Sequence, residues 1–452
     1  MKKSFLPLAI SAALSLVTTA VFANETTIPA PQVTDAPSKI IVGTDTLAGI
    51  DFFGYFRSGM GASDGGGSMK NATGGSFEKN KLGRLGNEFD TYAEVGFGKE
   101  LYNSGSQSVY MQTMINMYDG DTNSDHTNKF GWENMNIQFR NFMGMGETTW
   151  AGIRQYNKYS IDANDFFFWN QTNTGGGIEK MDLGQGKASV AVLHRDISEN
   201  ETDIANGGDP TIVTEDLIDS NQIELMYDSQ PLWDGATLAV GYKYLNADPN
   251  DKQIERANHG YSDGQTAMIM LTQQVLDKGV NNTVIQYYGK GSALQGVTFG
   301  AADTLNGTVK EGEGWAIRNY GSIPLAADWD LSHALNYAVA NDVELWNGDK
   351  GDASTAAVSA KVTYHWSDYT RTYLEMGYFG DKKTVNGTDY DRSGAKYTLA
   401  QALSYGRDKP ELRVFVSHYD SDKDNWAEES QSFNNGLDND TWAVGIQANV
   451  FW

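Results

Sequence analysis

The sequence predicts an all-β fold, a transmembrane antiparallel β-barrel that occupies residues 49–452. Three observations predict it. Short segments alternate between apolar and polar residues along most of the chain, which is the pattern of strands with two different faces. No apolar run beyond the N-terminus is long enough for a membrane-spanning helix, so any membrane span must be a barrel. The last segment has an apolar face bracketed by tryptophans, as expected where a strand meets both membrane interfaces.

The N-terminus has the features of a secretory signal peptide. Lys2 and Lys3 precede an apolar stretch over residues 5–17, and small residues lie at the usual offsets before a cut after Ala23. We therefore expect the first 23 residues to be removed on export. Residues 24–48 are polar, contain three prolines and show no sustained period. They are predicted to form a short periplasmic lead to the barrel.

Composition is consistent with an exported barrel and excludes several other classes. The chain has 23 Tyr, 19 Phe, 11 Trp and 49 Gly, which suits aromatic girdles and glycine-rich loops. It has no cysteine, so a disulfide scaffold or a cysteine-ligated metal is excluded. The net charge of -24 argues against nucleic acid, whose phosphates require clustered lysine and arginine.

The first two strand-like segments already separate into two faces. From residue 50, Phe52 and Phe56 fall on one face, and Phe53, Tyr55 and Arg57 fall on the other. Aromatic rings beside an arginine suit the wet interior of a pore.

In the next segment the same alternation predicts that Phe89, Val95 and Phe97 point outward, opposite Tyr92 and Glu94. Similar alternation recurs, between loops rich in Gly, Asp and Asn, at residues 107–117, 221–228, 236–244 and 372–378.

The C-terminal segment favours a membrane barrel over a soluble sandwich. Trp442, Val444 and Ile446 share an apolar face, while Gln447 and Asn449 lie on the other. At about 24 residues per strand and connection, the chain without its signal peptide suffices for roughly 16 to 18 strands, wide enough for a channel.

Several strings resemble one family, that of maltoporin and its relatives, the sucrose and aryl-glucoside porins. The resemblance runs from Asp51 to Trp452. It is carried by DFFGYFRSGMG (51–61), RLGNEFDTYAEVGFG (84–98), WAGIRQYNKYSIDANDFFFW (150–169), TLAQ (398–401) and the closing FW.

The resemblance implies an 18-stranded trimeric barrel in the bacterial outer membrane, surrounded by lipid and lipopolysaccharide and narrowed by an inward-folded constriction loop. It also implies facilitated diffusion of maltodextrins or related oligosaccharides, without a cofactor or metal. Sugar rings would stack on an aromatic slide while their hydroxyl groups bond to a polar track. Position by position, the slide is matched by Tyr55, Tyr92, Phe167 and Phe451, and the track by Arg57, Arg84, Glu94, Lys158 and Asp165.

The match departs from the family at several positions. Phe167 stands where maltoporin has tyrosine, and Lys158 replaces an arginine, which keeps the charge but loses the planar fork. Val280 occupies one slide position, and Phe89 replaces a cysteine of a loop disulfide. These departures leave open which sugar the pore carries.

Plainer interpretations remain for some of these residues. Arg84 can pair with Glu88 or Asp90 to stabilise the wall, and residues 166–169 can be core rather than lumen. A general, cation-preferring porin is the alternative function. An enzyme is not expected, because the six histidines show no metal-ligand spacing and no GxSxG motif is present.

Overall fold

The computed structural model describes residues 49–66, 77–119, 129–195, 197–202, 213–251, 261–303, 305, 309–407, 410–424 and 440–452. The predicted signal peptide and periplasmic lead therefore lie outside the described residues. The strands are β1 (Ile50–Ser63), β2 (Thr91–Asn103), β3 (Ser108–Asp119), β4 (Lys129–Arg140), β5 (Thr148–Ile161), β6 (Phe166–Asp182), β7 (Lys187–His194), β8 (Ile197–Thr202), β9 (Val213–Trp233), β10 (Ala236–Asp248), β11 (Gly264–Val275), β12 (Gly279–Lys290), β13 (Val309–Ala326), β14 (Trp329–Leu345), β15 (Lys350–His365), β16 (Thr370–Val385), β17 (Thr388–Ser404), β18 (Glu411–Asp424) and β19 (Asp440–Phe451).

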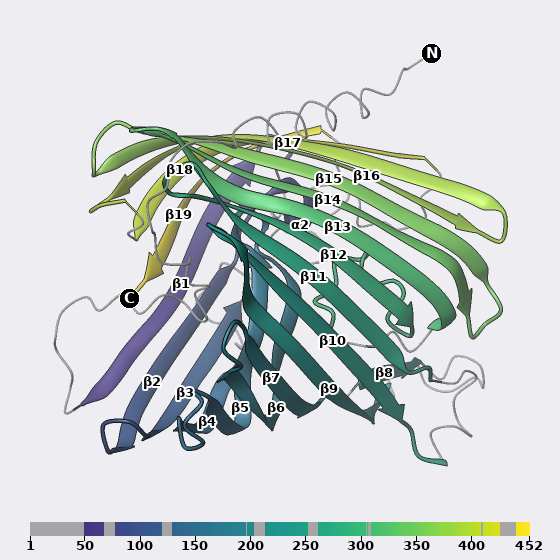
Figure 1. Cartoon of the computed structure of the whole chain (residues 1–452). Coiled ribbons are helices and arrows are strands. Elements are labelled where there is room, and N and C mark those ends of the chain that lie inside the picture. Colours follow the sequence, from purple (N-terminus) through teal and green to yellow (C-terminus); the bar gives the residue numbers. More distant parts are fainter. Residues whose placement is uncertain are drawn as a thin grey trace.

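These strands form one closed antiparallel barrel, as the sequence predicts. Each strand pairs with its neighbour in the chain, and β1 pairs with both β2 and β19, so that Tyr55 is flanked by Glu94 and Phe451. Figure 1 shows the strands running obliquely around the wall, with the first strand, β1, beside the last, β19. β7 and β8 pair in succession with β9, so they occupy one position in the wall. The predicted number of about 18 strands is confirmed.

The two faces of the wall differ in the way that the alternation predicts. On the outside lie exposed apolar side chains, and on the inside lie buried polar ones. The outward residues include Phe52, Val95, Phe97, Ile285, Ile317, Leu374, Leu399, Trp442, Val444 and Ile446. The inward residues include Arg57, Gln286, Arg318, Glu375, Lys396 and Gln447. An apolar outside and a polar inside are what a barrel in lipid requires.

The outward position predicted for Phe89 is wrong. β2 begins only at Thr91, so the alternation of that strand does not extend back to Phe89. The Phe89 ring is 1% exposed and packs edge-on against Phe415, on the inner wall, at 5.8 Å between ring centroids.

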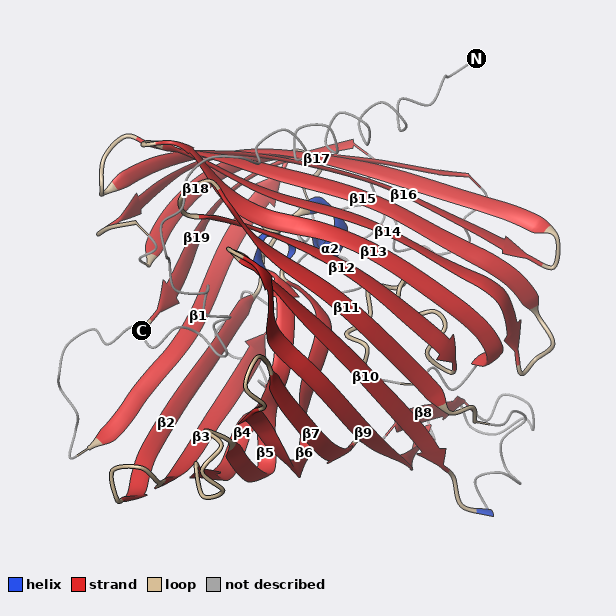
Figure 2. Cartoon of the chain, in the orientation of Figure 1, coloured by secondary structure: helices blue, strands red, loops and turns tan. Residues whose placement is uncertain are grey.

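Three stretches between strands fold into the barrel, and we call them the inner segments: residues 77–90, 162–165 and 291–303. The first contains the short helix α2 (Lys79–Leu82), which Figure 2 shows within the ring of strands. The second contains the single turn η1 (Asp162–Asn164), whose Asn164 side chain accepts a hydrogen bond from Ser359 on β15. The third is joined to the wall by Gln222, which donates to the carbonyl oxygen of Asp303. The core of the molecule therefore lies between these segments and the inner wall.

None of the helical turns in the described residues has the length and apolar character needed to cross a bilayer.

Candidate functional site

Three of the four predicted slide residues meet on the inner wall where the barrel closes. Tyr55 on β1 stands opposite Phe451 on β19, and Tyr92 on β2 lies one diagonal step away. The Tyr55 and Tyr92 rings are 6.2 Å apart between centroids and inclined at 49°. All three rings keep part of their surface exposed. They therefore form one partly open aromatic surface.

Phe167 lies at the start of β6, directly after the inner segment 162–165. Its neighbours Phe166, Phe168 and Trp169 are buried, whereas Phe167 is partly exposed. The ammonium group of Lys158 sits over the Phe167 ring, 4.3 Å from its centroid. Of the four consecutive aromatic residues, three are therefore buried in the core and one, Phe167, keeps part of its surface exposed.

The predicted polar residues divide into two groups. Arg57 and Asp165 are joined directly, because Arg57 Nη1 donates to Asp165 Oδ2 at 3.0 Å. Arg84 joins this group through Glu88, to which its Nε donates at 3.1 Å. Glu94 and Lys158 form the second group: they attract each other electrostatically, and the Asp165 carboxylate acts on Glu94 across the gap between the groups.

Each tyrosine of the aromatic surface is tied to a charged residue. The Tyr55 hydroxyl accepts a hydrogen bond from Arg84 Nη2 and donates one to Asn449, both at 2.8 Å. The Tyr92 hydroxyl donates to Glu94 at 2.5 Å. These bonds fix the orientation of the rings while their faces stay available.

Arg57 is less available than its place in the predicted track suggests. It is 7% exposed, and its Nε and Nη2 donate to both carboxylate oxygens of Asp90 at 3.0 and 2.8 Å. The guanidinium group also lies under the Tyr92 ring, 5.2 Å from the centroid. Bidentate pairing of this kind holds a guanidinium in one orientation.

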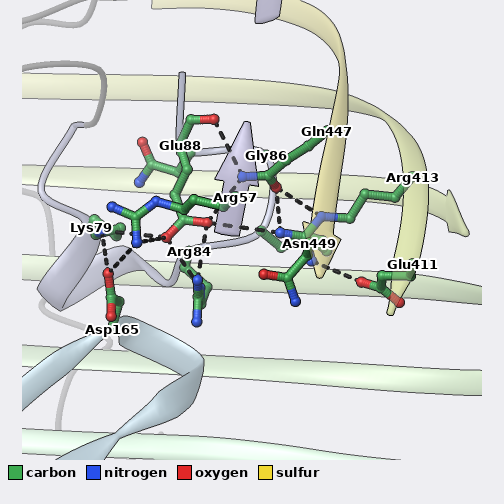
Figure 3. A network of polar contacts seen from close by, with 12 residues as sticks. Arg57, Lys79, Arg84, Gly86, Glu88, Asp165, Glu411, Arg413, Gln447 and Asn449 are labelled. Atoms are coloured by element: carbon green, nitrogen blue, oxygen red, sulfur yellow. Dashed lines mark hydrogen bonds and ion pairs between the residues drawn. The ribbon is translucent and has the colours of Figure 1, made fainter. Parts of the chain in front are cut away.

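Glu88 is the centre of the charged network, shown in Figure 3. Its carboxylate is fully buried and faces Arg84, Lys79, Arg57 and Arg413 at N–O distances of 3.1, 3.3, 3.5 and 3.8 Å. Burial by itself would raise the pKa of Glu88, but the four cations outweigh it and hold the pKa well below its ordinary value. The four cations therefore favour the ionised form of this buried carboxylate.

The same cations act on Asp165, on the inner segment 162–165. Burial opposes ionisation, and Arg84 and Lys79 overcome it, so that the pKa of Asp165 is lowered. Lys79 Nζ donates to Asp165 Oδ2 at 2.6 Å and also contacts Glu88. The ion pairs therefore join two inner segments to each other and to β1.

Sequence reasoning found part of this network. The pairing of Arg84 with Glu88 was an alternative that the spacing of four residues allowed, and the structure confirms the pairing. Lys79, Arg413 and Gln447 were missed as members of the network. Gln447 was placed on the inner face by alternation, but its partners are far away in the chain, Arg413 on β18 and Glu88 in the inner segment. Alternation gives the face of a residue and not its partners.

Within the described residues no group of three or more His, Asp or Glu side chains could hold a metal ion.

A closed antiparallel barrel with an apolar outside and a charged, aromatic-lined inside is the architecture of a porin-type membrane channel. The chain belongs to the LamB porin family, whose profile matches residues 50–452. It is a multi-pass outer-membrane protein. A porin is a channel and not an enzyme, which agrees with the lack of catalytic motifs in the sequence.

The similar proteins include two named maltoporins. Maltoporin 2 of Yersinia pseudotuberculosis is 33% identical over 419 residues, which cover 89% of this chain and 94% of the relative. Maltoporin 1 of Klebsiella pneumoniae is 32% identical over 433 residues, or 92% of this chain and 96% of the relative.

Solved structures of outer-membrane channels also align with the chain. The anion-selective porin of Comamonas acidovorans gives a TM-score of 0.45 at 10% identity, with 89% of this chain and 99% of that one covered. The outer-membrane channel DcaP of Acinetobacter baumannii gives 0.42 at 11% identity, with 91% and 99% covered.

Proposed function

We propose that this porin is sugar-selective and carries maltodextrins or related oligosaccharides across the outer membrane by facilitated diffusion. The observation that carries the proposal is the aromatic surface of Tyr55, Tyr92 and Phe451, with fixed charged groups beside it. A pyranose ring has an apolar face and a rim of hydroxyl groups. It therefore suits a wall that offers ring faces next to hydrogen-bonding groups.

In this proposal the slide consists of Tyr55, Tyr92, Phe167 and Phe451. The polar track has two kinds of members. Arg84, Glu94 and Lys158 are partly exposed and are placed to bond to sugar hydroxyl groups directly. Arg57 and Asp165 are engaged with each other and act by holding the tyrosines and the inner segment 162–165 in position. That segment, followed by Phe167, is proposed as the constriction of the pore.

The remaining parts of the account are proposals from the family resemblance. Residues 1–23 are a secretion signal, residues 24–48 are a periplasmic lead and residues 49–452 form the porin. The chain assembles as a homotrimer and is surrounded by lipid and lipopolysaccharide. Weak, repeated binding along the wall lets a sugar both enter and leave.

A general, cation-preferring porin is the competing function, and the net charge of -24 favours it. Uptake of labelled maltotriose into proteoliposomes separates the two. A sugar-selective pore gives a rate that saturates with concentration and is inhibited by unlabelled maltooligosaccharide. A general porin gives a rate that rises linearly and depends only on the size of the solute.

A further inference from the structure

The inner wall carries a second aromatic pair, closer to the end of the barrel at which β1 begins. Phe53 is two residues before Tyr55 on the same face of β1, and Tyr110 is on the inner face of β3. Both rings are partly exposed. Phe53 occupies the variable position of the DFxGYxRSG string, so the family resemblance does not assign it a role.

Two glycines of β2 allow these rings to lie flat against the wall. A Cβ at Gly96 would be 2.2 Å from Phe53 Cε2 and 2.6 and 2.7 Å from the two adjoining ring atoms. Three such similar distances place the face of the ring, rather than its edge, over the glycine. A Cβ at Gly98 would be 1.7 Å from the Tyr110 hydroxyl oxygen. Any larger residue at Gly96 or Gly98 would push these rings off the wall and into the lumen.

The polar groups at this pair are arranged as they are around Tyr55 and Tyr92. The Tyr110 hydroxyl reaches across β2 and donates to Asp51 on β1 at 2.9 Å. The Arg140 guanidinium lies over the Tyr110 ring, 4.2 Å from its centroid. Arg140 Nε and Nη2 both donate to Gln138, at 3.2 and 2.7 Å, whereas Nη1 donates to no group in the described part of the chain. A ligand oxygen can therefore bond to Nη1 without displacing a partner.

We propose that Phe53 and Arg140 form a further subsite for one pyranose unit of a neutral oligosaccharide, next along the wall after Tyr55. Phe53 provides the stacking face, Arg140 Nη1 provides the hydrogen-bond donor, and Tyr110 holds Arg140 in place. The subsite rests on the proposed sugar selectivity and lengthens the binding surface. Phe53 and Tyr55 are two residues apart on one strand, a separation of about 7 Å, so a single chain of sugar units can contact both.

The test is block of the ion current through single pores in a planar bilayer by maltooligosaccharides of two to seven glucosyl units. Phe53→Ala is expected to weaken block by the longer sugars about threefold to tenfold, the loss of one aromatic stacking contact. Block by maltose should change little, because the aromatic surface of Tyr55, Tyr92 and Phe451 can hold this short sugar alone. Phe53→Leu keeps the apolar volume without the ring face and should behave like Phe53→Ala.

Phe52→Ala is the matched control, because Phe52 is the neighbouring ring on the lipid face of the same strand. It should leave block by every sugar unchanged. Gly96→Ala should lower the open-pore current, since it drives the Phe53 ring into the lumen.

Equal block of the wild type and both Phe53 variants at every sugar length would overturn the subsite while leaving the proposed function intact. If Phe53→Ala weakened block by maltose and by the longest sugar equally, the subsite would be overturned too. The substitution would then have disturbed the whole binding surface and not one subsite. A wild type that no sugar blocks would overturn the proposed function, and the subsite with it.

Discussion

Arg57 and Arg84 carry the same charge but differ in what they can offer to a ligand. Arg57 is buried and donates from Nε, Nη1 and Nη2 to Asp90 and Asp165. Arg84 is partly exposed, and its Nη2 rests on the Tyr55 hydroxyl at the edge of the aromatic surface. We therefore expect Arg57 to position the site and Arg84 to contact the sugar.

Tyr92 is the residue that tests the slide most simply. Tyr92→Ala removes a partly exposed ring and should weaken block of the current by maltooligosaccharides about fivefold, since a stacking contact is worth about 1 kcal/mol. The open-pore current should change little. Tyr92→Phe keeps the ring and loses the hydroxyl group with its bonds to Glu94 and Asn116, so it should retain most of the block. If Tyr92→Ala is blocked as strongly as the wild type, Tyr92 is not part of the slide.

Glu88 should make a large contribution to stability. Glu88→Gln removes the charge that four cations share and leaves them buried without it, at a cost of about 3–5 kcal/mol in the free energy of unfolding. Urea unfolding in detergent micelles measures this change in the free energy of unfolding. Asp162→Asn is the control, because Asp162 is exposed and meets Arg84 only at 3.4 Å. Its cost should be below about 1 kcal/mol. A similar small cost for Glu88→Gln would contradict the central role of this carboxylate.

The lowered pKa of Glu88 also sets the direction of the pH dependence. A carboxylate with a folded-state pKa below its unfolded value stabilises the fold fully above the unfolded value, near 4.5. This stabilisation is lost only as the pH falls through the folded-state pKa. The wild type should therefore keep its stability and sugar block from pH 7 down to about pH 5. Loss of either between pH 7 and pH 5 would contradict this expectation, because a group that takes up its proton above the ordinary carboxylate range would then control the fold.

At the scale of elements, the inner segment 77–90 is held by a buried cation of the wall that bonds to main-chain oxygens. Lys396 on β17 donates to the carbonyl oxygens of Gly83 and Leu85 at 2.8 and 2.7 Å and pairs with Glu375 at 2.6 Å. Lys243 on β10 donates to the carbonyl oxygen of Asn170 at 3.0 Å. Lys396 therefore joins a loop backbone to a rigid strand, which fixes the loop without a disulfide, whereas Lys243 joins β10 to β6.

Lys396→Met should loosen the inner segment 77–90. It leaves Glu375 buried without its cation, a loss of about 3–5 kcal/mol, and it removes one of the two donors to each of the carbonyl oxygens of Gly83 and Leu85. Because Arg84 belongs to this segment, its contact with Tyr55 should become variable, and the open-pore current should fluctuate more. Lys361→Met is the control, since Lys361 faces the same lumen and contacts only the Tyr373 ring among the described residues. A steady current through Lys396→Met pores would argue against the proposal that Lys396 holds the inner segment 77–90 in place.

The elements also show where sequence reasoning succeeds and where it fails. Alternation correctly predicts the two faces of β1, β2 and β19, because each strand meets lipid on one side and the lumen on the other. It fails at Phe89, because a loop that folds inward follows no period. Nor could it find the bond between Ser359 and Asn164, which are 195 positions apart. The face on which a side chain lies is set by its own strand, whereas its hydrogen-bond partners are set by how the whole barrel closes.

At the scale of the whole molecule, β1 and β19 close the barrel, and the last two residues of this ladder serve opposite sides of the wall. Gly54 and Trp452 exchange both main-chain hydrogen bonds, at 3.0 and 3.1 Å. The Trp452 ring packs outside against Phe52, 5.5 Å between centroids. Phe451 points inward beside Tyr55. A residue that packs on the outside of the seam and one that lines the inner wall are therefore adjacent in sequence.

This division predicts opposite effects for two neighbouring substitutions. Trp452→Ala should lower stability by about 2 kcal/mol, less than for a fully buried tryptophan, and leave sugar block unchanged. Phe451→Ala should weaken sugar block with a smaller loss of stability. Thermal unfolding and bilayer currents on the same preparations measure both. If both substitutions changed stability and sugar block in the same way, the assignment of Trp452 to the outside and Phe451 to the inside of the wall would be wrong.

The central claim is that the lumen binds sugar, and block of the ion current in wild-type pores by sugar tests it most directly. Purified protein in a planar bilayer would be titrated with maltooligosaccharides of increasing length, and with sucrose and cellobiose. The account predicts saturable block, which tightens with length for maltooligosaccharides if they are the substrate. Preferential block by another sugar would change the proposed substrate, but the protein would still be a sugar-selective porin. A current that no sugar reduces would contradict the account and leave a general porin.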